Sequence, residues 1–215
     1  MTLVLNEEQL MLRDAAAGFL GDRATVAHLR ALRDRGDETG FDREVWREMA
    51  GMGWAGIAID EAYGGLGYGY TGLGVVLEQA GRHLSASPLE STVLVGATVL
   101  AQLANQGQKE AWLPAIAAGE RIVTLALQER RHHAPLETAM QATRVDDHYV
   151  LDGSKCLVLD AHVADAFIVI ARLGGHHRDH HGLSAFLVES GSEGLHVERR
   201  SFVDSRNTGT LLLRD

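Results

Sequence analysis

The spacing of hydrophobic residues changes near Gly119, and this change divides the chain into two parts. Before Gly119, apolar side chains recur every three to four positions, which is the period of an amphipathic helix. After it, short apolar runs are separated by turn-forming residues, which is typical of β-strands. The pattern therefore predicts an α+β protein in which helices precede strands.

Capping and breaking residues delimit the predicted helices. Asn6, followed three residues later by Gln9, has the form of a capping box, so the first helix should begin there. The fifth of the six predicted helices should begin at Ser87, because Pro88 then occupies the first helical position. The Gly64–Gly67 loop is expected where a side chain would clash or φ must be positive. The other helices are expected over residues 25–33, 42–52, 73–84 and 109–118, and the fifth extends to about Leu103.

Eight strands are predicted in the second part of the chain. Asp146-Asp147 and Asp152-Gly153 are hairpin-turn signals between them. Closely spaced strands joined by turns indicate an antiparallel barrel or a sandwich. The predicted strands cover residues 122–128, 138–145, 148–152, 155–159, 166–172, 183–189, 195–200 and 208–213.

Composition and charge narrow the class of protein. Hydrophobic residues make up 46% of the chain, so a sizeable core can form, and the net charge of −9 disfavours nucleic acid or an anionic membrane as a partner. Cys156 is the only cysteine, which excludes an internal disulfide and fits a reducing compartment. No signal-peptide pattern and no apolar run of roughly 18 residues is present. We expect a cytoplasmic protein.

Several short motifs, in this order and spacing, resemble the acyl-CoA dehydrogenase family. The resemblance spans essentially the whole chain. It implies an α-helical domain over residues 1–119 and an antiparallel β-barrel domain over 120–215, with the barrel incomplete at its C-terminal end and the family's C-terminal helical domain absent. The motifs are Tyr63-Gly64-Gly65-Leu66-Gly67, Gln108-Lys109-x-x-Trp112-Leu113-Pro114, Gly119-Glu120, Gln128-Glu129, Gly153-x-Lys155 and Ala164-Asp165.

The resemblance also implies a cofactor, a substrate and partners. These are FAD, an acyl-CoA thioester and an electron-transfer flavoprotein that accepts the electrons, with the protein working as a homo- or hetero-oligomer. By the same resemblance the flavin ring lies against two stretches of the barrel. The cofactor-binding candidates are Leu125, Leu127, Gln128, Ala134, Leu157 and Leu159.

Two of the family's flavin motifs are altered in this chain. Where the family has Thr-Glu-Pro-Gly-x-Gly-Ser-Asp, residues 128–135 read Gln-Glu-Arg-Arg-His-His-Ala-Pro, so only Glu129 is retained, for a structural role. The Gln128 amide can still hydrogen-bond a flavin edge. Arg130 and Arg131 are substrate-binding candidates that would face a CoA phosphate, and the alternative is a solvated basic loop.

The second altered motif follows the lysine of Gly153-x-Lys155. Here Leu157 stands in place of the family's flavin-covering Trp and Leu159 in place of its Thr hydroxyl. The alternative for both leucines is simple core packing.

The catalytic residue cannot be assigned from this sequence. The family reaction is α,β-dehydrogenation, in which a carboxylate removes the α-proton, and no residue here matches that base. We therefore expect no dehydrogenase turnover by this chain alone. The altered motifs leave two alternatives open: a non-catalytic partner subunit or pseudoenzyme of a heteromeric acyl-CoA dehydrogenase, and a nitroalkane oxidase or flavin monooxygenase of the same fold.

Two further signals favour ordinary structural roles. His176, His177, His180 and His181 lie in a glycine-flanked segment that is expected to be a loop without a specific metal site. Cys156, beside Lys155, is either a thiol of low pKa or a small buried hydrophobe, and the second is the commoner case.

Overall fold

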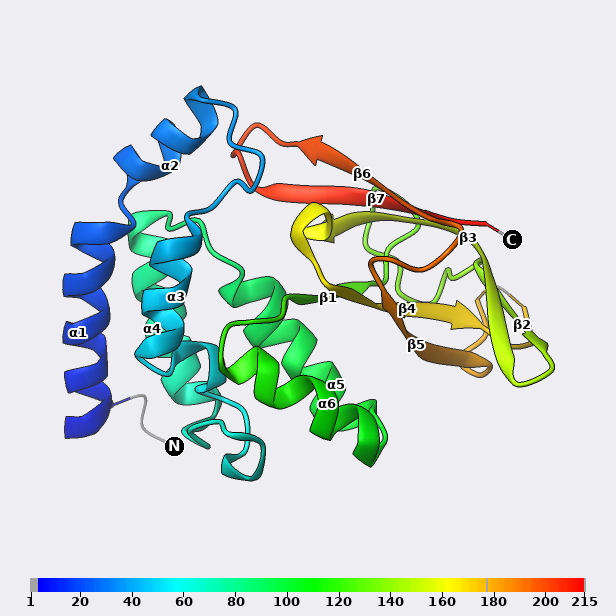
Figure 1. Cartoon of the computed structure of the whole chain (residues 1–215), viewed down its shortest axis with the longest axis horizontal. Helices are drawn as coiled ribbons and strands as arrows, with labels where there is room; N and C mark the ends of the chain where they lie inside the picture. The colour runs from blue at the N-terminus through cyan, green and yellow to red at the C-terminus, as the bar shows by residue number, and fades with distance from the viewer. Residues whose placement is uncertain (1–3, 177, 215) are drawn as a thin grey trace. The chain divides into compact units, whose positions relative to one another are not determined.

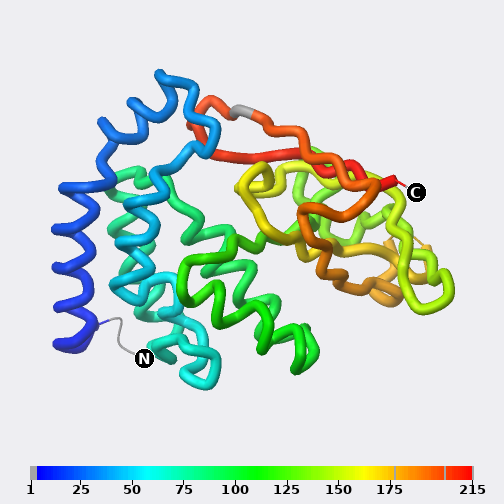
Figure 2. The backbone as a smooth tube through the Cα atoms, viewed as in Figure 1, coloured from blue at the N-terminus to red at the C-terminus, as the bar shows by residue number. Residues whose placement is uncertain are grey.

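The computed structural model describes residues 4–176 and 178–214 (Figure 1). It contains two compact units, Met1–Arg121 and Ile122–Asp215. The backbone trace shows the first unit as helices joined by loops and the second as a curled sheet (Figure 2). This arrangement confirms the α+β fold class. In the described ranges, no helix has the length and apolar character needed to cross a membrane.

The first unit contains six α-helices in its described part, and their starts follow the capping residues. In α1 the side chain of Asn6 accepts from the amide of Gln9 while the Gln9 side chain accepts from Asn6, so the capping box is confirmed. A second capping box, Asn105 with Gln108, starts α6 three residues earlier than predicted. The helices are α1 Glu7–Arg23, α2 Val26–Asp34, α3 Arg43–Gly51, α4 Gly69–His83, α5 Ala97–Leu103 and α6 Gln106–Ala117, with the short 3₁₀ turns η1 Trp54–Gly56 and η2 Glu61–Tyr63.

The predicted helix start at Ser87 is wrong. The chain forms a π-helix, η3 Leu89–Gly96, and the residue that precedes it, Pro88, provides no side-chain cap. Three consecutive residues of this π-helix, Ser91, Thr92 and Val93, are buried.

Glycines allow close backbone approaches around the Gly64–Gly67 loop, as predicted. Gly64 and Gly67 have φ of 77° and 59°. A Cβ on Gly65 would lie 2.1 Å from the carbonyl oxygen of Ile59, so only glycine fits there. The loop is closed by the amide of Gly67 donating to that same carbonyl at 2.8 Å.

The second unit is built on a seven-stranded mixed sheet, an open half-barrel rather than a purely antiparallel barrel. The strand order is β1-β4-β2-β3-β7-β6, with β5 pairing β4. The antiparallel prediction is wrong for β4, which runs parallel to both β1 and β2. The chain reverses direction between β2 and β3 and again between β3 and β4, so β2 and β4 point the same way. The strands are β1 Val123–Ala126, β2 Gln141–Val145, β3 His148–Leu159, β4 Ala166–Arg172, β5 Leu183–Glu189, β6 Leu195–Ser201 and β7 Asn207–Leu213.

Of the two predicted hairpin turns, one is confirmed and one is wrong. Asp146 and Asp147 form the turn between β2 and β3, with Asp146 at φ 52°. Asp152 and Gly153 lie inside the continuous strand β3. Gly153 is instead a close-approach residue, since a Cβ there would lie 3.1 Å from the side chain of Met140.

Candidate functional site

A buried ion pair connects the two stretches of chain that were predicted to hold the flavin. The side chain of Lys155 is fully buried in β3, and its Nζ donates to Glu129 Oε1 at 2.7 Å and to the carbonyl oxygen of Leu127 at 3.2 Å. Glu129 also accepts from the amides of Ala139 at 2.7 Å and Met140 at 3.0 Å. The pair therefore joins the end of β1, the middle of β3 and the approach to β2, and Glu129 has the structural role predicted for it.

Burial changes the proton affinities of Lys155 and its neighbour. Desolvation lowers the pKa of Lys155, and the hydrogen bond and charge of Glu129 oppose that shift. Desolvation, followed by the negative charge of Glu129, raises the pKa of the Cys156 thiol, which donates to the carbonyl oxygen of Arg130 at 3.3 Å. Cys156 is thus not a thiol of low pKa, and its behaviour is that of a small, partly buried side chain.

A β-bulge in β3 turns Leu157 outward. The register between β3 and β7 shifts between Lys155 and Val158. Leu157, inside the bulge, has φ 57°, a left-handed conformation that costs free energy for a branched side chain. Leu157 is 38% exposed, while Val158 beside it is buried. Bulges of this kind often re-aim a side chain next to a functional site.

The structure brings the two predicted leucine stretches side by side. The amide of Cys156 donates to the carbonyl oxygen of Gln128 at 2.7 Å, so the end of β1 runs along the bulge. Leu125, Leu127 and Leu159 are only half-buried, although Ala126 between the first two is buried. We call Leu125, Leu127, Leu157 and Leu159 the leucine strip.

The loop after β1 folds back on itself through Gln128. Its Oε1 accepts from the amide of Ala134 at 3.4 Å, and its Nε2 lies 2.7 Å from Nδ1 of His133. Gln128 and Ala134, which were predicted together as cofactor-binding residues, are therefore neighbours. Part of the hydrogen-bonding capacity of the amide is already used within the loop.

The two predicted substrate-binding arginines have different surroundings. Arg130 Nη1 lies 3.5 Å from Oε2 of Glu137, which also pairs with Arg178 at 2.5 Å. The hydrogen bond from Arg178 is the main cause that lowers the pKa of Glu137. Arg131 is exposed and makes no salt bridge with any residue in the described ranges.

Arg172 is a buried cation that the sequence analysis did not identify. Its only signal in the sequence is its position at the end of an apolar strand. It is 1% exposed. Its guanidinium donates to four carbonyl oxygens, those of Thr138 and Leu136 before β2 and those of His181 and Asp179 before β5. Arg172 thereby holds the histidine-rich loop against the segment that precedes Met140.

The histidine-rich loop gathers no metal-binding group among the residues that can be described. Asp179 there accepts from the amide of His176 at 2.8 Å, and this bond is the main cause that lowers the pKa of Asp179. Residues 4–176 and 178–214 hold no group of three or more His, Cys, Asp or Glu side chains suited to a metal ion. His177 lies outside the described residues.

Comparison with known proteins matches both units to one family. The family model "Acyl-CoA dehydrogenase, N-terminal domain" matches residues 6–120, and "Acyl-CoA dehydrogenase, middle domain" matches residues 128–215. The chain is 32% identical to benzylmalonyl-CoA dehydrogenase of Aromatoleum aromaticum over 93% of its own length and 52% of that protein. It is 30% identical to mitochondrial isovaleryl-CoA dehydrogenase of Pongo abelii, over 91% of the chain and 47% of that protein.

A solved structure agrees with these matches. A chain of the ChsE4–ChsE5 complex from Mycobacterium tuberculosis superposes with a TM-score of 0.86 at 29% identity, covering all of this chain and 56% of that one. The chain spans about half the length of the curated relatives that it matches.

Proposed function

The chain belongs to the acyl-CoA dehydrogenase family, and on this premise we propose that it binds FAD and takes part in α,β-dehydrogenation of an acyl-CoA thioester. The observation that carries the proposal is the leucine strip, a partly exposed apolar surface bordered by the Glu129–Lys155 pair. When bound, the flavin supplies the acceptor for the hydride that leaves the substrate. The chain's own residues bind and orient that ring.

The residues present fit a flavin ring. The leucine strip offers an apolar face for a planar aromatic system and excludes water from it. Next to the strip, the Gln128 amide offers a polar group to a ring edge. Leu159 carries no hydroxyl, so backbone groups and Gln128 have to supply the polar contacts. Glu129 and Lys155 fix the spacing between the strip's two halves.

The basic loop suits the phosphates of the thioester. Arg131 is exposed and makes no salt bridge with described residues, so it is available to a CoA phosphate. Arg130 shares Glu137 with Arg178, and a phosphate that recruits Arg130 has to compete with that carboxylate. We assign the catalytic base to no residue of 1–215.

Retention of flavin tests this proposal directly. The purified chain is mixed with FAD, passed through gel filtration and examined by visible absorption. We expect a flavin band that elutes with the protein. Leu157→Asp, which places a charge on the strip, should abolish that band. The matched control is Val145→Asp, at an apolar position of β2 that is 41% exposed, and it should retain the flavin.

Each outcome of this experiment has a clear meaning. A colourless wild-type protein after FAD addition would contradict flavin binding by this chain. Loss of flavin in both aspartate variants would contradict the assignment to the leucine strip, because any charge on the unit would then suffice. Equal retention of flavin by both aspartate variants would mean that the cofactor binds outside the leucine strip.

A partner role is a second candidate, favoured by one specific observation. The solved structure reported above comes from a complex of two named components. We propose, as the alternative, that this chain is a non-catalytic subunit of a heteromeric acyl-CoA dehydrogenase. Flavin that is retained only after a complete dehydrogenase chain is added would favour the subunit role. Flavin retained by the isolated chain would favour the first proposal.

An exposed groove on the helical unit supports a protein partner, and an electron-transfer flavoprotein is the one that the family suggests. Met11 on α1, with Met52 and Leu66, lines an open apolar groove of about 390 Å³. Met11 is 72% exposed and Leu66 is 51% exposed. Clustered exposed apolar side chains of this kind mark interaction surfaces. Reduction of an added electron-transfer flavoprotein by the substrate-reduced protein would test the partner.

A further inference from the structure

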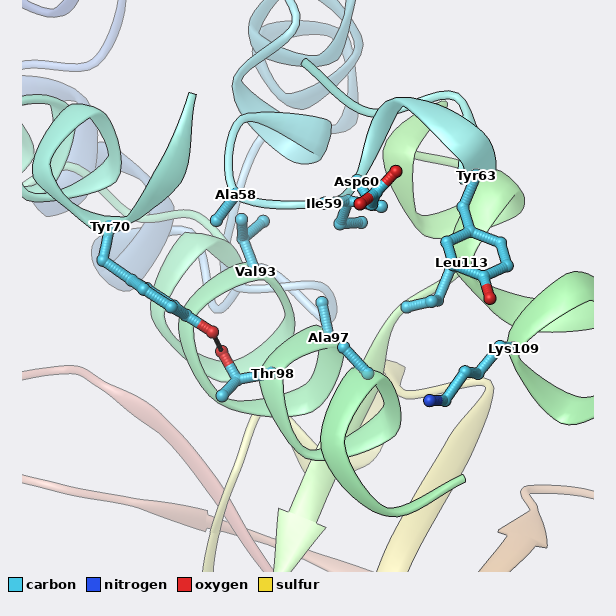
Figure 3. A pocket seen from close by; sticks show the side chains of 11 residues that line it. Ala58, Ile59, Asp60, Tyr63, Tyr70, Val93, Ala97, Thr98, Lys109 and Leu113 are labelled. Carbon is cyan, nitrogen blue, oxygen red and sulfur yellow. Dashed lines mark hydrogen bonds between the residues drawn. The ribbon is translucent and has the colours of Figure 1, made fainter. Parts of the chain in front are cut away.

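The helical unit contains a second, smaller cavity that the flavin proposal does not use. Its volume is about 190 Å³, below the usual range for drug-sized ligands. Loop residues 58–60, the π-helix, α5 and α6 form its walls (Figure 3). Its apolar lining consists of Ala58, Ile59, Val93, Ala97, Ala101 and Leu113.

Two charged side chains of opposite sign line this cavity. Figure 3 shows Lys109 extending from α6 toward the Ala97 side, with Asp60 on the opposite wall. Lys109 is half-buried, yet its ammonium makes no hydrogen bond or ion pair with any residue in 4–176 or 178–214. Asp60 is exposed; its Oδ1 accepts from the amide of Ala62 at 2.8 Å, and it forms no ion pair within the same ranges. Lys109 and Asp60 therefore do not satisfy each other.

The other polar groups of the cavity are already engaged. The hydroxyl of Tyr70 donates to Oγ1 of Thr98 at 3.0 Å (Figure 3), and the hydroxyl of Tyr63 donates to Oε1 of Gln106 at 3.3 Å. A ligand would consequently meet two free charges, one of each sign, separated by an apolar surface.

The residue type at position 109 is informative. Of the 20 lysine and arginine residues in the chain, only Lys109 and Lys155 are lysines. A lysine carries a compact ammonium on a narrow stem, whereas an arginine presents a broad planar fork. A cavity of this size can hold a lysine ammonium and still leave room for a small ligand.

We propose that this cavity binds a small zwitterionic amino acid with an aliphatic side chain. Its carboxylate pairs with Lys109, its ammonium pairs with Asp60, and its side chain lies on Val93, Ala97 and Leu113. Because Lys109 is half-buried, a ligand without a carboxylate would leave its ammonium unpaired in a partly desolvated place. Asp60 is exposed, so its pair with the ligand contributes less than the pair with Lys109. This binding is independent of flavin.

Calorimetric titration of the full chain with L-valine tests the proposal. We expect a dissociation constant of about 1 mM or below, which eight non-hydrogen atoms can provide. Isobutylamine, which lacks the carboxylate that pairs with Lys109, should bind at least about tenfold more weakly. Isobutyrate, which lacks the ammonium that pairs with the exposed Asp60, should bind about two- to fivefold more weakly.

Two variants locate the binding. Lys109→Met keeps the length of the side chain and removes its charge. Asp60→Asn keeps an oxygen for the amide of Ala62. Lys109→Met should weaken L-valine binding at least about tenfold, which is the effect of one lost charge-assisted contact. Asp60→Asn should weaken it about two- to fivefold, because Asp60 is exposed. Arg82→Met and Asp34→Asn, at surface pairs on α4 and α2, are the controls and should leave binding unchanged.

Three results would overturn the proposal. The first is the absence of any heat of binding at roughly 20 mM L-valine, which is about 20 times the expected dissociation constant. The second is isobutyrate or isobutylamine binding as tightly as L-valine. The third is unchanged binding in Lys109→Met or Asp60→Asn. Weaker binding of L-valine by both variants, with unchanged binding by both control variants, supports the proposal.

Discussion

The chain's two lysines lie in two regions that handle a buried charge in opposite ways. In the sheet unit, Lys155 is fully buried, and Glu129 and the carbonyl oxygen of Leu127 satisfy its ammonium. In the helical unit, Lys109 is half-buried beside a cavity and has no such partner among the described residues. Residue type alone therefore predicts neither role.

The difference between the two lysines separates charges that stabilise the fold from charges that are available to a ligand. A charge that is buried and paired within the chain holds segments together, and its removal leaves the other charge uncompensated. A partly covered charge without an internal partner adds little to stability and remains available to a second molecule. Mutations at the two lysine regions should accordingly affect different measurements.

Breaking the buried pair should give the largest effect. Glu129→Gln leaves the Lys155 ammonium buried without its carboxylate, and we expect a loss of about 3 to 5 kcal/mol in the free energy of unfolding of the sheet unit. Hydrogen exchange of amides in β1 and β3 measures this unit separately, since protection reports local as well as global opening.

The double variant Glu129→Gln with Lys155→Met provides the control for that prediction. It removes both charges together, so its cost should be smaller than the sum of the two single costs. A cost below about 1 kcal/mol for Glu129→Gln alone would show that the pair is not a structural centre.

Leu157 allows stability and flavin binding to be separated. Leu157→Gly relieves the left-handed strain at φ 57° and should stabilise the sheet unit by about 1 kcal/mol. The same change removes a side chain from the leucine strip and should weaken FAD retention. The measurements are chemical denaturation and the flavin absorbance after gel filtration.

Leu159→Gly is the matched variant on the same strand. Leu159 has ordinary extended backbone, so glycine there should destabilise the strand. If Leu157→Gly also destabilised the unit, the contacts of the leucine side chain would outweigh the strain.

Local signals in the sequence were sufficient for most element boundaries. Asn6, Thr25 and Asp42 each cap a helix through a side-chain oxygen, and such caps depend only on neighbouring residues. Strand 166–172 was also predicted correctly, because its continuous apolar run is typical of a strand buried on both faces.

Features that depend on distant residues could not be predicted in this way. The π-helix after Pro88 and the parallel pairing of β1 with β4 depend on tertiary packing. Gly153 reads locally as a turn residue, but the approach of Met140 gives it another role. The four carbonyl oxygens that accept from Arg172 come from two loops, so no short sequence motif predicts these contacts.

A smaller effect is expected from acid titration of Glu137. Its pKa lies below the usual 4.5 in the folded protein, chiefly because Arg178 donates to it, with Arg130 and His132 adding positive charge. Its stabilisation is therefore present above pH 4.5 and is lost as the pH falls through the lowered value. Glu137→Gln should flatten the fall of the unfolding midpoint of the sheet unit between pH 5 and pH 3. An unchanged slope would contradict a coupling between Glu137 and the two arginines.

The smallest effect should come from Lys109, and this contrast with Lys155 is the sharpest form of the comparison. Lys109→Met removes a charge that has no partner among the described residues, so the free energy of unfolding should change by no more than about 0.5 kcal/mol. Chemical denaturation followed by tryptophan fluorescence measures the helical unit, because Trp46, Trp54 and Trp112 all lie in it. A loss of several kcal/mol would mean that Lys109 supports the fold as Lys155 does, and its ammonium would then no longer be available to a ligand.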